Sequence, residues 1–174
     1  FTENVRHESS RLRDLLDKLL AMARLEKLES LPAHKSAVSI SALVQEWQHS
    51  RYALLAEKQL DITVNEGALQ AEADTFRLAL FNLLDNALRF ANENTTIMVH
   101  VDVACLTVTN TGPVIPDYAL GRITERFYSL PSPGQERSSG LGLAMVSEIA
   151  SLHGGSLKVE NTHQGVQARL ILPE

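Results

Sequence analysis

Two asparagines stand four residues apart in the leucine-rich segment F-N-L-L-D-N-A-L-R-F, residues 81–90. Asparagine is a poor helix former, yet the spacing of the apolar residues predicts a helix capped by Asp74. At helical spacing, Asn82, Asn86 and Arg89 fall on one narrow face. Amide oxygens are hard, neutral ligands that suit Mg²⁺, and a guanidinium pairs with phosphate oxygens. The face therefore predicts a metal and phosphate site, although any amphipathic helix shows some polar stripe.

A second segment, V-T-N-T-G-P-V-I-P at residues 108–116, ends a predicted strand at Asn110. Gly112 allows the backbone to be approached closely, and Ile115 follows between two prolines. A polar side chain at a strand end, beside a glycine turn, can read the edge of a flat heterocycle. Alone this signal is weak, because glycine-proline turns commonly follow strands.

A third segment, S-S-G-L-G-L-A at residues 138–144, places a glycine-bearing loop at the start of a predicted helix. The first turn of a helix presents unpaired N–H groups and the positive end of the helix dipole, which together bind anions. Gly140 and Gly142 let a phosphate chain approach the backbone. The segment follows a long irregular stretch, residues 111–139, whose length is typical of lids and binding loops.

Hydrophobic periodicity predicts the elements that position these residues. Residues 1–29 form an amphipathic helix whose apolar stripe needs a partner helix, and Ser30 to Pro32 end it. The other predictions are a strand at 38–40, a helix capped by Ser41 to about residue 58, strands at 60–64 and 69–71, a helix from Asp74 to Phe90, a hairpin of strands 95–101 and 104–109, a helix at 141–153, and a hairpin of strands 156–161 and 166–172. This order predicts an α+β domain in two layers, with one mixed sheet and its helices on a single face.

The composition is that of a globular chain of 174 residues, with 44% hydrophobic and 21% charged residues. The net charge of -5 offers no general reason to bind nucleic acid or an anionic membrane. Cys105 is the single cysteine, so no disulfide forms within the chain and a reducing compartment is expected. No apolar run approaches the length of about 20 residues that a bilayer requires.

Taken in order, the three segments resemble the ATP-binding domain of sensor histidine kinases, within the wider family that includes Hsp90 and DNA gyrase B. N-L-L-D-N-A-L-R-F is similar to its asparagine box, N-T-G-P-V-I to its first glycine box, R-F-Y-S to its aromatic box and S-S-G-L-G-L-A to its second glycine box. I-P-D-Y-A-L-G-R-I further resembles the CreC-like group of these kinases. The resemblance implies the Bergerat fold for a catalytic domain at 38–174 with a lid at about 113–139, a linker at 31–37, and the second helix of a dimerisation and phosphotransfer hairpin at 1–30.

The resemblance also implies the ligand, ATP with Mg²⁺, and a role for each matching residue. Asn86 is expected to bind Mg²⁺, with Asn82 beside it as a second candidate ligand, and Arg89 to meet the phosphates. Phe90 is expected to pack on the adenine or ribose, and Asn110 to face the adenine amino group. The other expected nucleotide-binding residues are Gly112, Ile115, Arg126 in the lid, Gly140, Leu141, Gly142 and Leu143.

For the whole protein, the resemblance implies a histidine kinase that passes phosphate to a response regulator. It implies a homodimer formed through the N-terminal helix and the rest of its hairpin. The chain opens inside a helical pattern, so we expect a cytoplasmic fragment of a longer bacterial inner-membrane sensor, without membrane contact of its own. The family's phosphoacceptor motif is absent, since H-E-S-S-R-L at His7 lacks its proline. The fragment is expected to bind ATP without phosphorylating itself, and no catalytic residue is assigned in it.

The chain departs from the family pattern at four positions. Asn110 stands where the family usually has aspartate, and a carboxylate accepts the adenine amino N–H in a stronger, charge-assisted bond. Val114 replaces a common glycine, Thr124 a common phenylalanine and Ser138 the first glycine of the last motif. These departures predict weaker nucleotide binding, and they leave open a degenerate nucleotide-binding module.

Two other functions stay open on the sequence: an ATP-hydrolysing clamp of the Hsp90 or gyrase kind, and a serine kinase of the anti-sigma type. The hydrolases place a glutamate four residues before the box asparagine, as the general base for water. Here that position is Asn82, which cannot take a proton, and Asp85 points to another side of the helix. The long helix at residues 1–29 argues against the anti-sigma type, because it belongs to a dimerising bundle. A histidine kinase is the favoured hypothesis.

Overall fold

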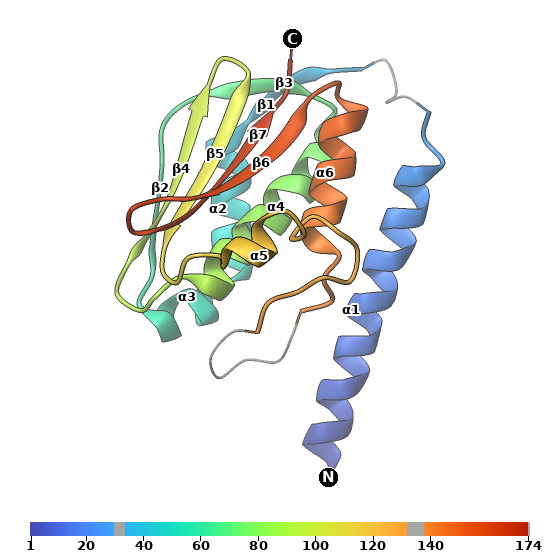
Figure 1. The fold of residues 1–174 in the computed structure, drawn as a ribbon, viewed down its shortest axis with the longest axis vertical. Coiled ribbons are helices and arrows are strands. Elements are labelled where there is room, and N and C mark those ends of the chain that lie inside the picture. Colours follow the sequence, from blue (N-terminus) through green and yellow to red (C-terminus); the bar gives the residue numbers. More distant parts are fainter. Residues whose placement is uncertain (30–33, 132–137, 174) are drawn as a thin grey trace.

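The computed structural model describes residues 1–29, 34–131 and 138–173, and Figure 1 shows the arrangement of its elements. In chain order these are α1 (Thr2–Glu26), β1 (Ser36–Ser39), α2 (Ile40–Ser50), α3 (Tyr52–Lys58), β2 (Asp61–Val64), β3 (Ala68–Ala71), α4 (Ala73–Phe90), β4 (Thr96–Asp102), β5 (Cys105–Thr111), α5 (Asp117–Leu120), α6 (Gly142–Leu152), β6 (Ser156–Asn161) and β7 (Gly165–Ile171).

A five-stranded mixed sheet with the order β2-β4-β5-β7-β6 forms one layer of the domain. β2 runs parallel to β4, and the pairs β4–β5, β5–β7 and β6–β7 are antiparallel. Helices α2, α4 and α6 form the second layer, on one face of this sheet (Figure 1). This confirms the predicted α+β class. β1 and β3 pair with each other in a separate two-stranded sheet.

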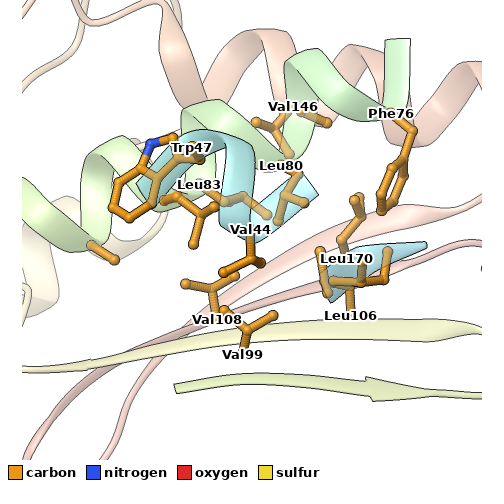
Figure 2. Close-up of a cluster of buried hydrophobic side chains, with 14 of the residues drawn as sticks. Val44, Trp47, Phe76, Leu80, Leu83, Val99, Leu106, Val108, Val146 and Leu170 are labelled. Atoms are coloured by element: carbon orange, nitrogen blue, oxygen red, sulfur yellow. The ribbon is translucent and has the colours of Figure 1, made fainter. Parts of the chain in front are cut away.

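The core lies between the two layers, and alternation along the strands explains it. β4 and β5 bury every second side chain, as expected for a sheet with one face covered. Figure 2 shows Val99, Val108 and Leu106 of these strands beneath side chains from the helices. From the helix layer come Val44 and Trp47 of α2, Phe76, Leu80 and Leu83 of α4, and Val146 of α6.

Three helix boundaries differ from the predictions. α2 is capped by Ser39, not Ser41, because the Ser39 hydroxyl accepts a hydrogen bond from the Ala42 N–H (3.4 Å). α4 is capped by Glu72, not Asp74, and the Glu72 carboxylate accepts from the N–H groups of the next turn. The single helix predicted to residue 58 is two helices, interrupted at Arg51.

An interaction with α4 lies at the interruption at Arg51. The Asp85 carboxylate accepts hydrogen bonds from Trp47 Nε1 (2.9 Å), Arg51 Nε (2.9 Å) and Arg51 Nη2 (3.2 Å). Trp47 is completely buried, so its indole N–H needs such an acceptor. Asp85 thereby joins the break between α2 and α3 to the middle of α4.

α1 runs alongside α6 (Figure 1). Met22 and Leu25 are buried in the core cluster, and Glu26 forms an ion pair with Arg126. Most of the predicted apolar stripe stays exposed, namely Val5, Leu12, Leu16, Leu19 and Leu20. None of the described helices combines the length and the apolar character that a bilayer span requires.

Some predictions fall outside the described residues. The predicted helix stop at Ser30 to Pro32 lies there, as does the first part of the linker predicted at 31–37. Its last two residues, Ser36 and Ala37, belong to β1. The lid predicted at about 113–139 contains the short helix α5, and its residues 132–137 are not described.

Candidate nucleotide site

A cavity of about 380 Å³ opens where α4, the end of β5 and the start of α6 meet. The loop after β5 and the segment before the undescribed residues 132–137 also line it. Its described lining is predominantly apolar and consists of Leu83, Asn86, Ala87, Phe90, Val108, Asn110, Pro113, Val114, Ile115, Pro116, Tyr118, Ile123, Tyr128, Ser129, Leu130, Pro131, Ser138, Gly140, Gly142, Leu143, Val159, Val166 and Ala168.

The cavity brings together residues from all three segments that the sequence singled out. From α4 come Asn86 and Phe90, and from the first glycine segment come Asn110 and Ile115. The second glycine segment contributes Gly140, Gly142 and Leu143. The predicted residues outside this lining are Asn82, Arg89, Gly112, Arg126 and Leu141.

Asn82 packs between α4 and α6 instead of lining the cavity. Its Nδ2 donates to the Leu78 carbonyl (2.8 Å) and lies 3.9 Å from Met145 Sδ. A Cβ on Gly142 would come within 3.1 Å of Asn82 Oδ1. The start of α6 therefore lies close against this asparagine, and the close packing favours glycine at position 142.

Arg89 lies at a different groove, between α1 and the second glycine segment. That groove is also lined by His7 and Arg11 of α1 and by Ser138 and Ser139. Burial lowers the pKa of the Arg89 guanidinium. Its central carbon lies 5.7 Å from the centre of the Phe90 ring. Arg89 is thus adjacent to the cavity but separated from its lining.

Asn110 is a buried polar residue that lines the cavity. Along β5 the buried face carries Leu106, Val108 and then Asn110, so an amide occupies a position that the alternation assigns to the core. Asn110 is only 7% exposed, and its buried Nδ2 has no hydrogen-bond partner among the described residues. Such an orphan donor is uncommon in protein interiors.

The end of β5 is pressed against the end of α4. A Cβ on Gly112 would lie 2.3 Å from the Phe90 carbonyl oxygen, so no larger residue fits there without a backbone shift. Lys58 Nζ donates to the carbonyls of Leu88 (2.8 Å), Arg89 (3.0 Å) and Ala91 (3.1 Å). A cation at a helix C-terminus is favourable, and this one holds the turn that carries Phe90.

The start of α6 leaves the N–H groups of its first turn without a side-chain cap. Its N-cap is Leu141, which offers no side-chain cap for the first turn of N–H groups. Gly140 has φ of +72°, and a Cβ there would lie 2.5 Å from the Phe127 carbonyl carbon. The Phe127 N–H donates to the Gly140 carbonyl (2.9 Å), which ties the segment after α5 to the glycine segment.

Sequence reasoning missed several residues of the site. Val159, Val166 and Ala168 of β6 and β7 line the cavity, and their alternation with polar neighbours was a usable signal. Tyr118 of α5 and Tyr128, in the segment after it, also line the cavity. Lys58 and Asn161 form hydrogen bonds with backbone groups next to the cavity. No sequence pattern indicates these contacts, because the partners are distant in sequence.

Acidic, basic and histidine side chains are absent from the described lining of the cavity. In the part of the chain that the structure describes, no group of three or more His, Cys, Asp or Glu residues could hold a metal ion. The arrangement offers an apolar slot with one buried amide, a second amide at Asn86 and a helix N-terminus. It suits a flat heterocycle attached to a phosphate chain.

The comparisons with known proteins agree with this geometry. Residues 71–174, more than half of the chain, match the family model of histidine kinase-, DNA gyrase B- and HSP90-like ATPases. The chain belongs to this family, and the predicted resemblance is confirmed.

Within the family, the chain is similar to sensor histidine kinases. It is 42% identical to the sensor protein CreC of Escherichia coli K12 over 171 residues, which cover 95% of this chain and 36% of CreC. It is 33% identical to the sensor protein QseC of the same strain, over 87% of this chain and 34% of QseC. The chain therefore spans about a third of the length of these relatives.

Solved structures show the same fold. Full-length ShkA in complex with AMPPNP matches with a TM-score of 0.75 at 25% identity, over 96% of this chain and 36% of ShkA. The cytoplasmic segment of the histidine kinase QseC matches with a TM-score of 0.63 at 23% identity, over 95% of this chain and 94% of that segment.

Proposed function

We propose that this chain binds Mg-ATP as the catalytic domain of a two-component sensor histidine kinase. In the whole protein it transfers the γ-phosphoryl group to a histidine outside this chain, and a response regulator then receives the phosphoryl group on an aspartate. The observation that carries the proposal is the single cavity shared by Asn86, Phe90, Asn110 and the Gly140–Leu143 segment. Its residues come from three separate regions of the sequence.

The cavity divides into an apolar part and a polar part. Val108, Val166 and Ala168 line the sheet side, where the base of the nucleotide packs. The triphosphate extends toward the N-terminus of α6, where unpaired N–H groups and the helix dipole stabilise its charge. The glycines at 140 and 142 leave the backbone accessible to the phosphate oxygens.

Asn86 fits the role of a magnesium ligand. It lines the cavity one turn before Phe90, and its amide oxygen is a neutral oxygen ligand. Because the described lining contains no cationic side chain, a triphosphate in the cavity needs a cation to balance it. Mg²⁺ supplies that charge, and Asn86 would hold it with oxygens from the phosphates and water. Asn82, whose Nδ2 donates to Leu78, stays a second candidate.

A kinase is favoured over a hydrolase because the described lining of the cavity holds no base for water. No Asp, Glu or His belongs to its described lining. Asp85, the nearest carboxylate in the sequence of α4, accepts hydrogen bonds from Trp47 and Arg51. Without a group to activate water, the acceptor is a nucleophile brought from elsewhere, as a phosphoacceptor histidine would be.

Calorimetric titration with ATP tests the nucleotide site. Asn86→Ala is expected to weaken Mg-dependent ATP binding by about ten-fold or more, the scale of losses found at residues that support metal sites. The matched control is His100→Ala, on the exposed side of β4, which should bind like the parent chain. Removing Mg²⁺ with a chelator should weaken the parent chain and change Asn86→Ala little. Equal affinity of Asn86→Ala and the parent chain would overturn the proposal.

The proposal places this chain on the cytoplasmic side of an inner-membrane sensor that is a homodimer through α1. The exposed stripe of α1, including Leu12, Leu16 and Leu20, is the surface that the partner helices of the hairpin would cover. Incubation of the fragment with labelled ATP should leave it unlabelled, because it lacks the phosphoacceptor motif. An acid-labile label on His7 would contradict this assignment.

A further inference from the structure

We propose that Asn110 makes this site accept triphosphates of 6-oxopurines, such as hypoxanthine and guanine, in addition to ATP. The inference rests on the proposed nucleotide-binding function and names the substrate class of the same site. Asn110 would be the residue that determines specificity at the base.

The position of Asn110 in the cavity supports a contact with the base and not with the phosphates. It lies on the buried face of β5, next to the apolar side chains of Val108 and, across the strand pair, Val166. The glycine segment leads into α6, and Asn86 belongs to α4. A planar, apolar ring system packs in the apolar part, and the edge of the ring meets the Asn110 amide.

The chemistry of an amide differs from that of a carboxylate in one decisive way. An ionised carboxylate only accepts hydrogen bonds, whereas an amide accepts through Oδ1 and donates through Nδ2. Position 6 of adenine carries an amino donor, and position 6 of hypoxanthine or guanine carries an oxygen acceptor. Asn110 can therefore pair with either class, whereas a carboxylate would repel the lone pairs of a 6-oxo group.

The surroundings allow the amide to present either atom. Rotation about the last side-chain bond of asparagine is broad and roughly two-fold, so the exchange of Oδ1 and Nδ2 is not opposed by a strong rotamer preference. A residue that is hydrogen-bonded to the protein would be held in one orientation. Asn110 has no such restraint, because its buried Nδ2 has no partner among the described residues.

The same orphan donor gives the 6-oxo group a favourable contact. A buried N–H without a partner destabilises its surroundings, and an acceptor placed beside it removes that penalty. The neighbours Val108, Val166 and Ala168 carry no polar side-chain atoms that could serve as that acceptor. An oxygen at position 6 of a purine can supply it when the amide rotates and turns the buried Nδ2 toward the cavity.

Calorimetric titration with ATP, ITP and GTP, each with Mg²⁺, tests the inference on the chain as it exists. ITP carries hypoxanthine, which differs from adenine at position 6 and in a proton on N1. We expect the parent chain to bind ATP and ITP within about five-fold of each other, since each satisfies the amide. GTP should bind with an affinity similar to that of ITP, and any further difference in affinity would arise from its 2-amino group.

The variant Asn110→Asp provides the decisive comparison. It should raise the preference for ATP over ITP by about 20-fold or more relative to the parent chain, because a site that only accepts hydrogen bonds rejects an oxygen in place of an amino group. Asn110→Ala removes both the hydrogen-bond donor and the acceptor, and it should weaken the binding of ATP and of ITP in equal proportion. Loss of stability alone would not change the ratio of two ligands measured on one protein.

The outcomes separate this inference from the function on which it rests. If the parent chain binds ATP, rejects ITP and shows the same ratio as Asn110→Asp, the inference is wrong and the nucleotide site stands. If none of the three triphosphates binds, the proposed function fails and this inference fails with it.

Discussion

The side chain of Asn161 holds both backbone polar groups of Ile115. Its Oδ1 accepts from the Ile115 N–H and its Nδ2 donates to the Ile115 carbonyl, each at 2.8 Å. Asn161 is the last residue of β6, and Ile115 lies in the irregular segment that follows β5. Ile115 lies outside the strands, and the Asn161 side chain supplies the two backbone hydrogen bonds that a neighbouring strand would otherwise provide. It thereby fixes the loop that lines the cavity.

Loss of this contact should loosen the loop and weaken nucleotide binding. Asn161→Ala removes two hydrogen bonds and is expected to lower the free energy of unfolding by about 1–3 kcal/mol. Asn161→Asp keeps the acceptor for the Ile115 N–H but sets an oxygen against the Ile115 carbonyl, so its ATP affinity should also fall. Urea unfolding and calorimetry measure the two effects. Gln164→Ala, an exposed change in the same hairpin, serves as the control, and an Asn161→Ala variant with unchanged ATP affinity would contradict the role.

Asp85 is expected to serve stability and not catalysis. Asp85→Asn weakens the acceptor for Arg51 and Trp47 and should lower the free energy of unfolding by about 1.5–3 kcal/mol, the scale of hydrogen bonds to charged groups. ATP affinity should remain that of the parent chain, since Asp85 lies outside the described cavity lining. ATP hydrolysis that is present in the parent chain and abolished in Asp85→Asn would instead identify a general base and favour a hydrolase.

Stability should fall as the pH drops below the ordinary pKa of histidine, because of His153. This residue is 4% exposed, its Nε2 accepts from the Glu72 N–H (3.1 Å), and its Nδ1 lies 2.8 Å from the Ile149 carbonyl oxygen. Burial lowers the pKa of His153 below 6.5, with Lys35 acting in the same direction and the carboxylate of Glu72 opposing. The unfolded chain therefore binds more protons in this range, and the stabilisation is full above pH 6.5 and lost below it.

The parent chain and His153→Gln should show different pH dependence in urea unfolding. Glutamine can accept from the Glu72 N–H but does not titrate in this range. Between about pH 7 and about pH 5, the parent chain should lose up to about 1.4 kcal/mol per pH unit more than the variant. Parallel pH profiles of the two proteins would rule out His153 as the cause.

The ion pair between Glu26 and Arg126 should compete with nucleotide binding if Arg126 contacts phosphate. The two side chains are half exposed and join α1 to the segment after α5. Glu26→Gln releases Arg126 and should raise ATP affinity by at most about five-fold, because exposed ion pairs contribute only about 0.2–1 kcal/mol. In an Arg126→Ala background the same change should have no effect. A gain in ATP affinity that persists in that background would contradict a contact between Arg126 and the phosphates.

The sequence by itself determined the local structure and the class of protein. Periodicity located the hairpins β4–β5 and β6–β7 and the helices α1, α4 and α6, because alternation and helical spacing are local properties of the chain. Two of the three boundaries that failed did so where nearby polar residues compete as caps: Ser39 against Ser41, and Glu72 against Asp74. The three motifs identified the family because their residue types and order are specific in combination.

Only the tertiary structure decided which of those residues share one cavity. Asn82, Asn86 and Arg89 lie on one face of α4, but their surroundings differ. Asn82 packs against α6, Asn86 lines the cavity, and Arg89 lines the groove beside α1. The sequence also did not indicate that β6 and β7 line the cavity or that Asn161 binds the Ile115 backbone. Nor did it indicate that the Asn110 amide has a donor without a partner among the described residues. Each depends on contacts between segments far apart in the chain, and no local periodicity encodes such contacts.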